Sequence, residues 1–216
     1  MSDRIWSEVD AYIEDRLVGE DAALSATIRE SAAAGLPAIA VSAAQGKMLH
    51  LLALSIGAKR ILEVGTLGGY SAIWMARALG QDGQLVSLEI DPRNAELASD
   101  NIRRAGLNDR VDILVGPAIS RLPSLQGPFD LTFIDADKQS NADYFDYAVQ
   151  LSRRGAVIVV DNVIRNGDVI GPGGNAQVQG VRRMMDAISK DKRVSATAIQ
   201  TVGNKGYDGF LVAVVL

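Results

Sequence analysis

From residue 60 onward, short apolar runs alternate with segments whose apolar residues recur at i, i+3 and i+4, the spacing of an amphipathic helix. The apolar runs predict strands at residues 60–64, 84–89, 111–115, 131–134 and 156–160, and the segments between them predict helices at 70–79, 93–105 and 142–151. Strands that alternate with helices form a parallel sheet with right-handed crossovers. The pattern therefore predicts an α/β protein with helices on both faces of the sheet.

The C-terminal part of the chain predicts a helix at 177–189 and two more strands at 195–200 and 209–215. Because too few residues separate these two strands for a crossover helix, we expect them to pair antiparallel. The prediction is thus a Rossmann-like sheet of seven strands, mostly parallel, whose last strand is antiparallel. Residues 164–178 are rich in glycine and asparagine and predict a mobile loop, which either borders a ligand pocket or is a plain surface connection.

Residues before the first strand predict three helices, at 3–17, 22–34 and 43–56, with Ser42 as the N-cap of the third. We expect one domain spanning residues 1–216, in which about 57 N-terminal residues form a helical cover. Trp6 and Tyr12 in the first helix either close over a pocket or contribute to a dimer face, and the sequence leaves both open.

Composition removes many kinds of chemistry. The 216 residues include no cysteine, which excludes disulfides and thiolate catalysis, and one histidine, His50, which lies in an apolar helical stretch and is expected to be structural. A net charge of −4 argues against a nucleic-acid-binding protein. No apolar run is long enough to span a membrane, so we expect a cytoplasmic protein without a membrane partner.

The turn after the first strand is rich in glycine and runs from Glu63 to Ser71 as EVGTLGGYS. Counted from Gly65, it matches neither the dinucleotide-binding glycine pattern nor a P-loop. Glu89 ends the second strand 24 residues after Gly65, about where an acidic residue holds the hydroxyls of a ribose. Glu63, the glycine turn and Glu89 together favour a cofactor that contains adenosine.

Acidic and amide side chains end the fourth and fifth strands. Asp135 follows the fourth strand, and Asp161 and Asn162 follow the fifth. Neighbouring parallel strands bring these oxygens to one edge of the sheet, where two carboxylates call for a cation. Oxygen ligands suit Mg²⁺ or Ca²⁺. The alternative is that the two aspartates only cap the segments that follow them.

With these motifs, the chain resembles the cation-dependent class I O-methyltransferases that use S-adenosylmethionine, the group that contains catechol and caffeoyl-CoA O-methyltransferases. The resemblance covers residues 41–216 and rests on five motifs in the same order, namely SAAQG from Ser42, EVGTLGGYS from Glu63, DADK from Asp135, Asp161-Asn162 and GYDGF from Gly206.

The resemblance assigns roles to individual residues. It implies that the methionine end of the cofactor is lined by Val41, Glu63, Gly65, Thr66 and Ser71. It implies that Glu89 holds the ribose, that Ala118 bonds the adenine through its backbone and that Asp135 lies near the cofactor. It implies that Asp135, Asp161 and Asn162 bind the metal and that Asp135 and Lys138 are catalytic, with Lys138 as general base. Pro117 stands where many relatives have aspartate, so adenine binding would depend on Ala118 and apolar contact.

The resemblance thus implies transfer of a methyl group from S-adenosylmethionine to a hydroxyl of a small vicinal diol such as a catechol, a hydroxycinnamoyl-CoA or a flavonoid. The expected metal is Mg²⁺ or another divalent cation such as Mn²⁺ or Ca²⁺, and the expected assembly is a homodimer. One alternative is a tRNA hydroxyuridine O-methyltransferase, for which Arg103, Arg104 and Arg110 offer a small basic cluster. Another is a non-catalytic S-adenosylmethionine-binding module, which would be expected to lack Lys138 or the metal ligands.

Overall fold

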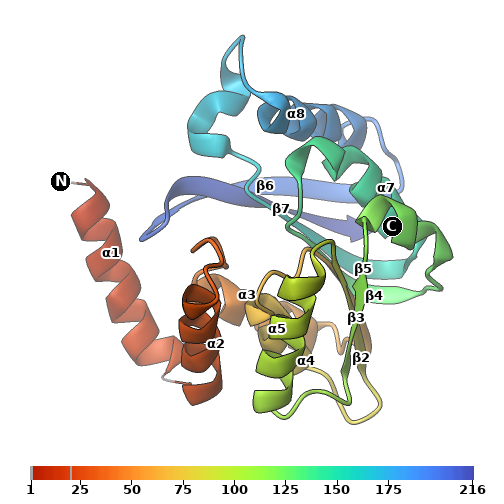
Figure 1. Cartoon of the computed structure of the whole chain (residues 1–216). Coiled ribbons are helices and arrows are strands. Elements are labelled where there is room, and N and C mark those ends of the chain that lie inside the picture. Colours follow the sequence, from red (N-terminus) through yellow and green to blue (C-terminus); the bar gives the residue numbers. More distant parts are fainter. Residues whose placement is uncertain (1, 20) are drawn as a thin grey trace.

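The computed structural model describes residues 2–19 and 21–216, and its centre is one sheet in the order β3-β2-β1-β4-β5-β7-β6 (Figure 1). The first five strands are parallel, and β7 is antiparallel to both β5 and β6. This confirms the predicted fold class. The strands are β1 Arg60–Val64, β2 Gln84–Glu89, β3 Val111–Val115, β4 Phe129–Ile134, β5 Ser152–Asp161, β6 Val194–Gly203 and β7 Gly206–Val215.

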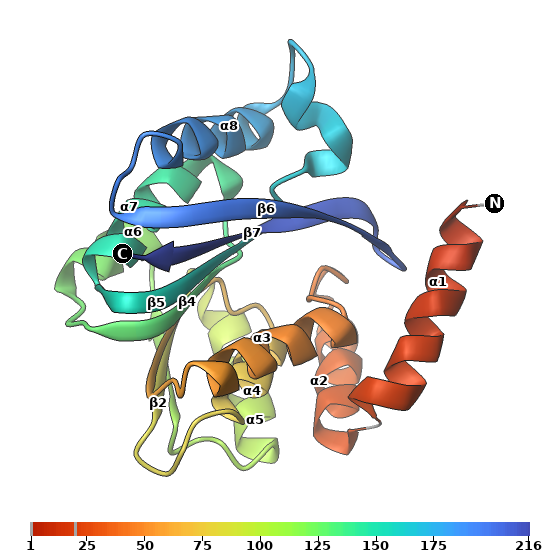
Figure 2. The same cartoon turned by 180° about the vertical axis from the view of Figure 1, so that it is seen from behind.

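Helices cover both faces of the sheet, as Figures 1 and 2 show from opposite sides. Side chains alternate between the faces along each strand, so Ile61 joins one apolar cluster and Leu62 the other. The first cluster includes residues of α2 Ala22–Ala33, α3 Ala43–Ser55, α4 Tyr70–Ala76 and α5 Pro92–Arg104. The second includes residues of α7 Asn141–Gln150 and α8 Ala176–Ile188, with the short α6 Ala118–Arg121 packed against it.

The N-terminal helices differ in how they pack: α3 lies against the helices of the sheet, whereas the first helix stands apart. The predicted N-cap is confirmed, because Ser42 Oγ accepts the N–H of Gln45 at 3.2 Å, and α3 then packs on α4. Helix α1 Ser2–Ile13 stands away from the other helices and continues into a π-helical turn, Glu14–Val18 (Figure 2). It meets the β6–β7 hairpin, where Asp10 accepts the N–H of Asn204 at 2.7 Å.

The division into one domain with a helical cover stays a prediction, and Met1 and Glu20 within it lie outside the described residues. The predicted structural role of His50 agrees with its position on α3, where Nδ1 lies 3.1 Å from the carbonyl oxygen of Trp74. Within residues 2–19 and 21–216, no helix is long and apolar enough to cross a bilayer.

The segment after β5 corrects one expectation. Instead of being irregular throughout, it contains a 3-10 helix, Arg165–Ile170, which is kinked at Asn166 and Gly167, where φ is positive; the predicted mobility of the loop stays a prediction. Arg182 of α8 holds the segment, because its guanidinium donates to the carbonyl groups of residues 168, 169, 171 and 173. Asn166 and Gly167 therefore supply the turn within a connection that Arg182 holds against α8.

Candidate active site

A cavity of about 840 Å³ runs along the carboxyl ends of the strands. Its lining includes most of the residues predicted to bind a cofactor, a metal or a substrate, namely Val41, Gly65, Thr66, Ser71, Glu89, Ala118, Asp135, Lys138 and Asn162. Two predicted residues, Glu63 and Asp161, are not part of this lining. The sheet order β2-β1-β4-β5 arranges Glu89, Gly65, Asp135 and Asn162 in sequence across the cavity floor.

The glycine turn brings the backbone close to a neighbouring strand. Gly65 has φ +100°, and a Cβ atom there would lie 2.5 Å from the carbonyl oxygen of Asp135. Any side chain at this position would displace the end of β4, which explains the glycine. Leu67 also takes a positive φ of 50°, so the turn needs support from its surroundings.

Glu89 provides that support from the end of β2. One carboxylate oxygen accepts the N–H groups of Thr66 at 3.2 Å and Leu67 at 2.8 Å, and the other accepts the N–H of Asp91 at 3.0 Å and lies 3.4 Å from Asn94 Nδ2. A carboxylate has about four acceptor positions, so these donors use most of them. Glu89 therefore shapes the cavity wall, and its contact with a ribose stays a prediction.

Glu63 lies beneath the turn and is fully buried. Its two carboxylate oxygens accept the hydroxyls of Ser71 and Ser87, each at 2.5 Å, and Thr66 Oγ1 lies 2.5 Å from Ser87 Oγ. Burial raises the pKa of Glu63 to about 7, and the carboxylates of Asp135 and Glu89 add to the increase. The structure thus brings Glu63 to the underside of the cavity wall, and its predicted contact with a cofactor stays a prediction.

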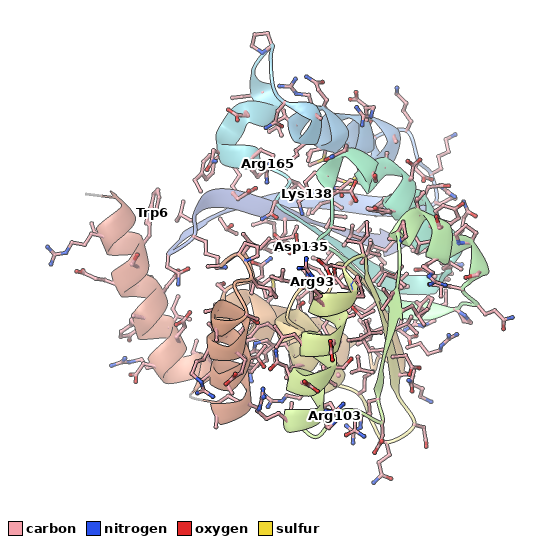
Figure 3. The ribbon with its side chains drawn as sticks, in the orientation of Figure 1. Trp6, Arg93, Arg103, Asp135, Lys138 and Arg165 are labelled. Atoms are coloured by element: carbon pink, nitrogen blue, oxygen red, sulfur yellow. The ribbon has the colours of Figure 1, made fainter. Side chains whose placement is uncertain are left out.

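Asp135 and Lys138 form a charged pair in the cavity lining, and Asp161 lies close to both of them, outside that lining. The Lys138 ammonium is buried and donates to Asp135 Oδ1 at 2.6 Å, and Figure 3 shows the two residues near the middle of the molecule. Burial and the neighbouring carboxylate of Asp135 raise the pKa of Asp161 to about 6, against the opposing effects of Gln45 and Lys138. Asn162 follows with φ +55°, and its N–H donates to Asp161 Oδ1 at 2.8 Å.

The donor atoms fit a hard divalent cation. No group of three or more histidine, aspartate or glutamate residues suited to a metal occurs in the described part of the chain. The predicted ligand set contains only two carboxylates, those of Asp135 and Asp161, and its third oxygen is the amide oxygen of Asn162. The pKa of Asp161 is raised in part because Asp135 is a like charge nearby, and a cation between the two would reverse that effect. Oxygen donors of this kind suit Mg²⁺, Mn²⁺ or Ca²⁺.

Three residues of the site carried no signal in the sequence. Lys205, in the β6–β7 turn, donates to the carbonyl oxygen of Ala40. Burial lowers the pKa of Lys205, and the nearby carboxylates of Asp135 and Asp161 oppose this lowering. Tyr144 donates to Asp137 Oδ1 at 2.6 Å within the cavity lining. Arg165 lines the cavity beyond Asn162.

Of the other residues singled out in the sequence, Pro117 and Ala118 lie in the cavity lining and Trp6 does not. Pro117 opens α6 and lines the cavity with Ala118, next to Ile119. Trp6 is not in the cavity lining, and Figure 3 shows it on α1, apart from Asp135 and Lys138.

Comparison with known proteins gives a consistent result. A family model described as O-methyltransferase matches residues 14–211. The chain is 54% identical to a catechol O-methyltransferase from Mycobacterium tuberculosis over 96% of this chain and 95% of the relative, and 50% identical to one from Niastella koreensis over 100% of both. The structure of an O-methyltransferase from Bacillus cereus in complex with SAH aligns with a TM-score of 0.97 at 50% identity, covering 99% of this chain and 100% of that one. The chain belongs to the O-methyltransferase family.

Proposed function

We propose that this chain transfers a methyl group from S-adenosylmethionine to one hydroxyl of a small vicinal diol, with the help of a divalent cation. The observation that carries the proposal is the ion pair of the buried Lys138 with the partly buried Asp135, which lies on the cavity floor between the glycine turn and Asn162. The similarity to a structure in complex with SAH supports the cofactor. The catechol O-methyltransferases among the relatives support a diol as the acceptor.

The strand order gives the cofactor a direction. Ala118 and Glu89 belong to the β3 and β2 end of the cavity, which suits adenosine, and Gly65 and Ser71 at β1 suit the methionine. Adjacent strands lie about 4.8 Å apart, so the ends of β2 and β5 are separated by three spacings, or about 14 Å. An extended cofactor that starts at Glu89 therefore points its methyl group toward Asp135, and the acceptor would bind near Asn162.

The chemistry requires an oxygen nucleophile beside the methyl donor. When bound, a divalent cation would hold both oxygens of the diol and lower the pKa of the reacting hydroxyl. Once Lys138 has released a proton to solvent, its neutral Nζ accepts the hydroxyl proton as general base, and Asp135 orients that amine through the 2.6 Å contact. Asp135, Asp161 and Asn162 would hold the cation, and the walls of the cavity fix the geometry of the transfer.

The structure favours a small acceptor over tRNA. Arg103 pairs with Asp100, Arg104 donates to Asn101 and Arg110 donates to the carbonyl oxygen of Leu79, so the basic cluster is engaged within the fold. Figure 3 shows Arg103 at the end of the molecule remote from Asp135 and Lys138. A non-catalytic module is disfavoured because Lys138, Asp135, Asp161 and Asn162 are all present.

A radiolabel assay tests the proposal. The protein is incubated with methyl-labelled S-adenosylmethionine and, separately, with catechols, hydroxycinnamoyl-CoA esters, flavonoids and bulk tRNA, each with and without chelator. We expect transfer to at least one diol, loss of transfer with chelator and recovery with added Mg²⁺. Transfer to tRNA alone, or full transfer to a diol in excess chelator, would contradict the proposal.

We also propose a homodimer that uses α1. Ile5, Val9 and Tyr12 are 56%, 49% and 59% exposed, and their i, i+4, i+7 spacing puts them on one side of the helix. A second copy would cover this apolar side. Light scattering should give twice the chain mass for the wild type and a lower mass for Ile5→Glu/Val9→Glu, whereas a monomeric wild type would contradict the dimer. The cytoplasmic location stays a prediction.

A further inference from the structure

The charges in the cavity lining leave one cation without a carboxylate in close contact. Lys138 and Arg165 are the basic residues of the lining within the described ranges, and Lys138 already donates to Asp135 at 2.6 Å. Arg165 has a carboxylate, that of Asp208, only at the outer limit of an ion pair, with Nη1 4.0 Å from Oδ2. The Arg165 side chain is 26% exposed, so water reaches only part of its guanidinium, and no carboxylate is in close contact with that charge.

Several hydrogen bonds fix the backbone and the side chain of Arg165. The residue has φ +53°, a conformation that costs a non-glycine residue about 1–3 kcal/mol and persists only when the surroundings impose it. Asp208 Oδ1 imposes it by accepting the N–H groups of Ile164 and Arg165, each at 2.9 Å. Gln177 then orients the side chain, because its Oε1 accepts from Arg165 Nη2 at 2.5 Å.

Arg165 lies at the acceptor end of the cavity. It comes three residues after Asn162, beyond β5, whereas the adenosine end lies at β2 and β3. Figure 3 shows Arg165 on the same side of the molecule as Lys138, above Asp135. A group on the acceptor that points away from the cofactor would therefore meet this guanidinium.

We propose that Arg165 binds a carboxylate of the acceptor, so that the preferred substrate is a vicinal diol that carries an acidic group. The inference rests on the proposed function and narrows its substrate class. A guanidinium has five N–H donors in one plane, of which Gln177 takes one, and the rest suit the two oxygens of a carboxylate. The cavity lining also includes the apolar residues Ile39, Ala40 and Val41, whose side chains suit contact with an aromatic ring.

The test compares an acid with its neutral amide. Methyl transfer to 3,4-dihydroxybenzoate and to 3,4-dihydroxybenzamide is measured for the wild type, Arg165→Gln and Arg154→Gln. Arg154 is an exposed residue at the opposite end of β5, so its variant makes the same charge change outside the cavity. We expect Arg165→Gln to lower kcat/KM for the acid by about 10- to 100-fold, mainly through KM, and for the amide by less than about twofold. Arg154→Gln should match the wild type on both.

The outcomes separate this inference from the proposed function. An equal loss on acid and amide, or no loss on either, would overturn the role of Arg165 while diol methylation itself persists. Failure of the wild type to methylate any diol would overturn the proposed function instead. Circular dichroism and S-adenosylmethionine affinity establish that Arg165→Gln is folded; if it is not, Arg165→Lys replaces it and should retain part of the preference for the acid. A folded Arg165→Lys that loses both substrates equally would also overturn the inference.

Discussion

Glu63 makes a quantitative prediction, because its carboxyl group is fully buried and accepts hydroxyl hydrogen bonds from Ser71 and Ser87. The substitution Glu63→Gln keeps the shape of the side chain and removes its ionisation. The serine hydroxyls can rotate to accept from the new amide, so the local network is retained. The variant therefore isolates the effect of the charge.

The magnitude follows from the pKa. Burial raises the pKa of Glu63 from 4.5 to about 7, so the folded protein holds this proton more tightly than the unfolded chain. The stabilisation is complete below pH 4.5 and is lost as the pH rises through 7. At 1.36 kcal/mol per unit, the whole displacement is worth about 3 kcal/mol, and most of it falls between pH 5 and pH 8.

Urea unfolding followed by circular dichroism, at pH 5, 6, 7 and 8, measures this effect. The free energy of unfolding of Glu63→Gln relative to the wild type should rise by about 2–3 kcal/mol from pH 5 to pH 8. Glu96→Gln is the control, because Glu96 is exposed on α5, and its curve should run parallel to that of the wild type. A parallel curve for Glu63→Gln as well would refute the assignment of a buried, proton-binding Glu63.

Other changes have equally direct outcomes. Gly65→Ala should lower the free energy of unfolding by more than about 2 kcal/mol in urea titrations, because its Cβ would meet the Asp135 carbonyl oxygen at 2.5 Å, whereas Gly80→Ala, with no atom within 4 Å of its Cβ, should not. Lys138→Ala should slow turnover by about 10²-fold at pH 7 and recover as the pH rises, since hydroxide can replace the base; a pH-independent deficit in kcat would contradict that role. Arg182→Lys should cost about 1–3 kcal/mol in thermal unfolding and expose residues 165–173 to limited proteolysis, and unchanged proteolysis would contradict its role as their anchor.

Hydrophobic pattern predicts the buried part of this fold well and its edges less well. The strands β1 to β3 have the predicted bounds. Most residues of β1 and β2 are buried between two layers of helices, whereas in the edge strand β3 only Val111 is buried and the apolar run alone marks the strand. Strand β6 is longer than predicted, extending over Val194–Gly203, and nearly all of its residues are exposed. Strand β5 begins at Ser152, before its apolar run, because its first residues pair with β4 at the edge of the core. In such positions backbone pairing, and not side-chain burial, determines the strand.

The site divides in the same way. Residues at strand ends, such as Asp135 and Asn162, are predictable because the topology of a parallel sheet gathers them at one edge. The orientation of the Glu63 side chain is not predictable from a motif, because its carboxylate is held by Ser71 and Ser87, which lie eight and 24 residues further along the chain. Arg165 reaches the cavity from a 3-10 helix, and Lys205 lies close to Asp135 and Asp161 from a hairpin turn, where local sequence carries no periodic signal.

In the proposed function, two strand-end aspartates hold one divalent cation beside the general base. Electron paramagnetic resonance of Mn²⁺, titrated into metal-free wild type and Asp161→Asn, measures that binding. We expect one tightly bound ion per wild-type chain, strong weakening of that site in the variant and a parallel loss of methyl transfer. Stoichiometric Mn²⁺ binding that survives Asp161→Asn, or full methyl transfer by protein with no bound ion, would contradict it.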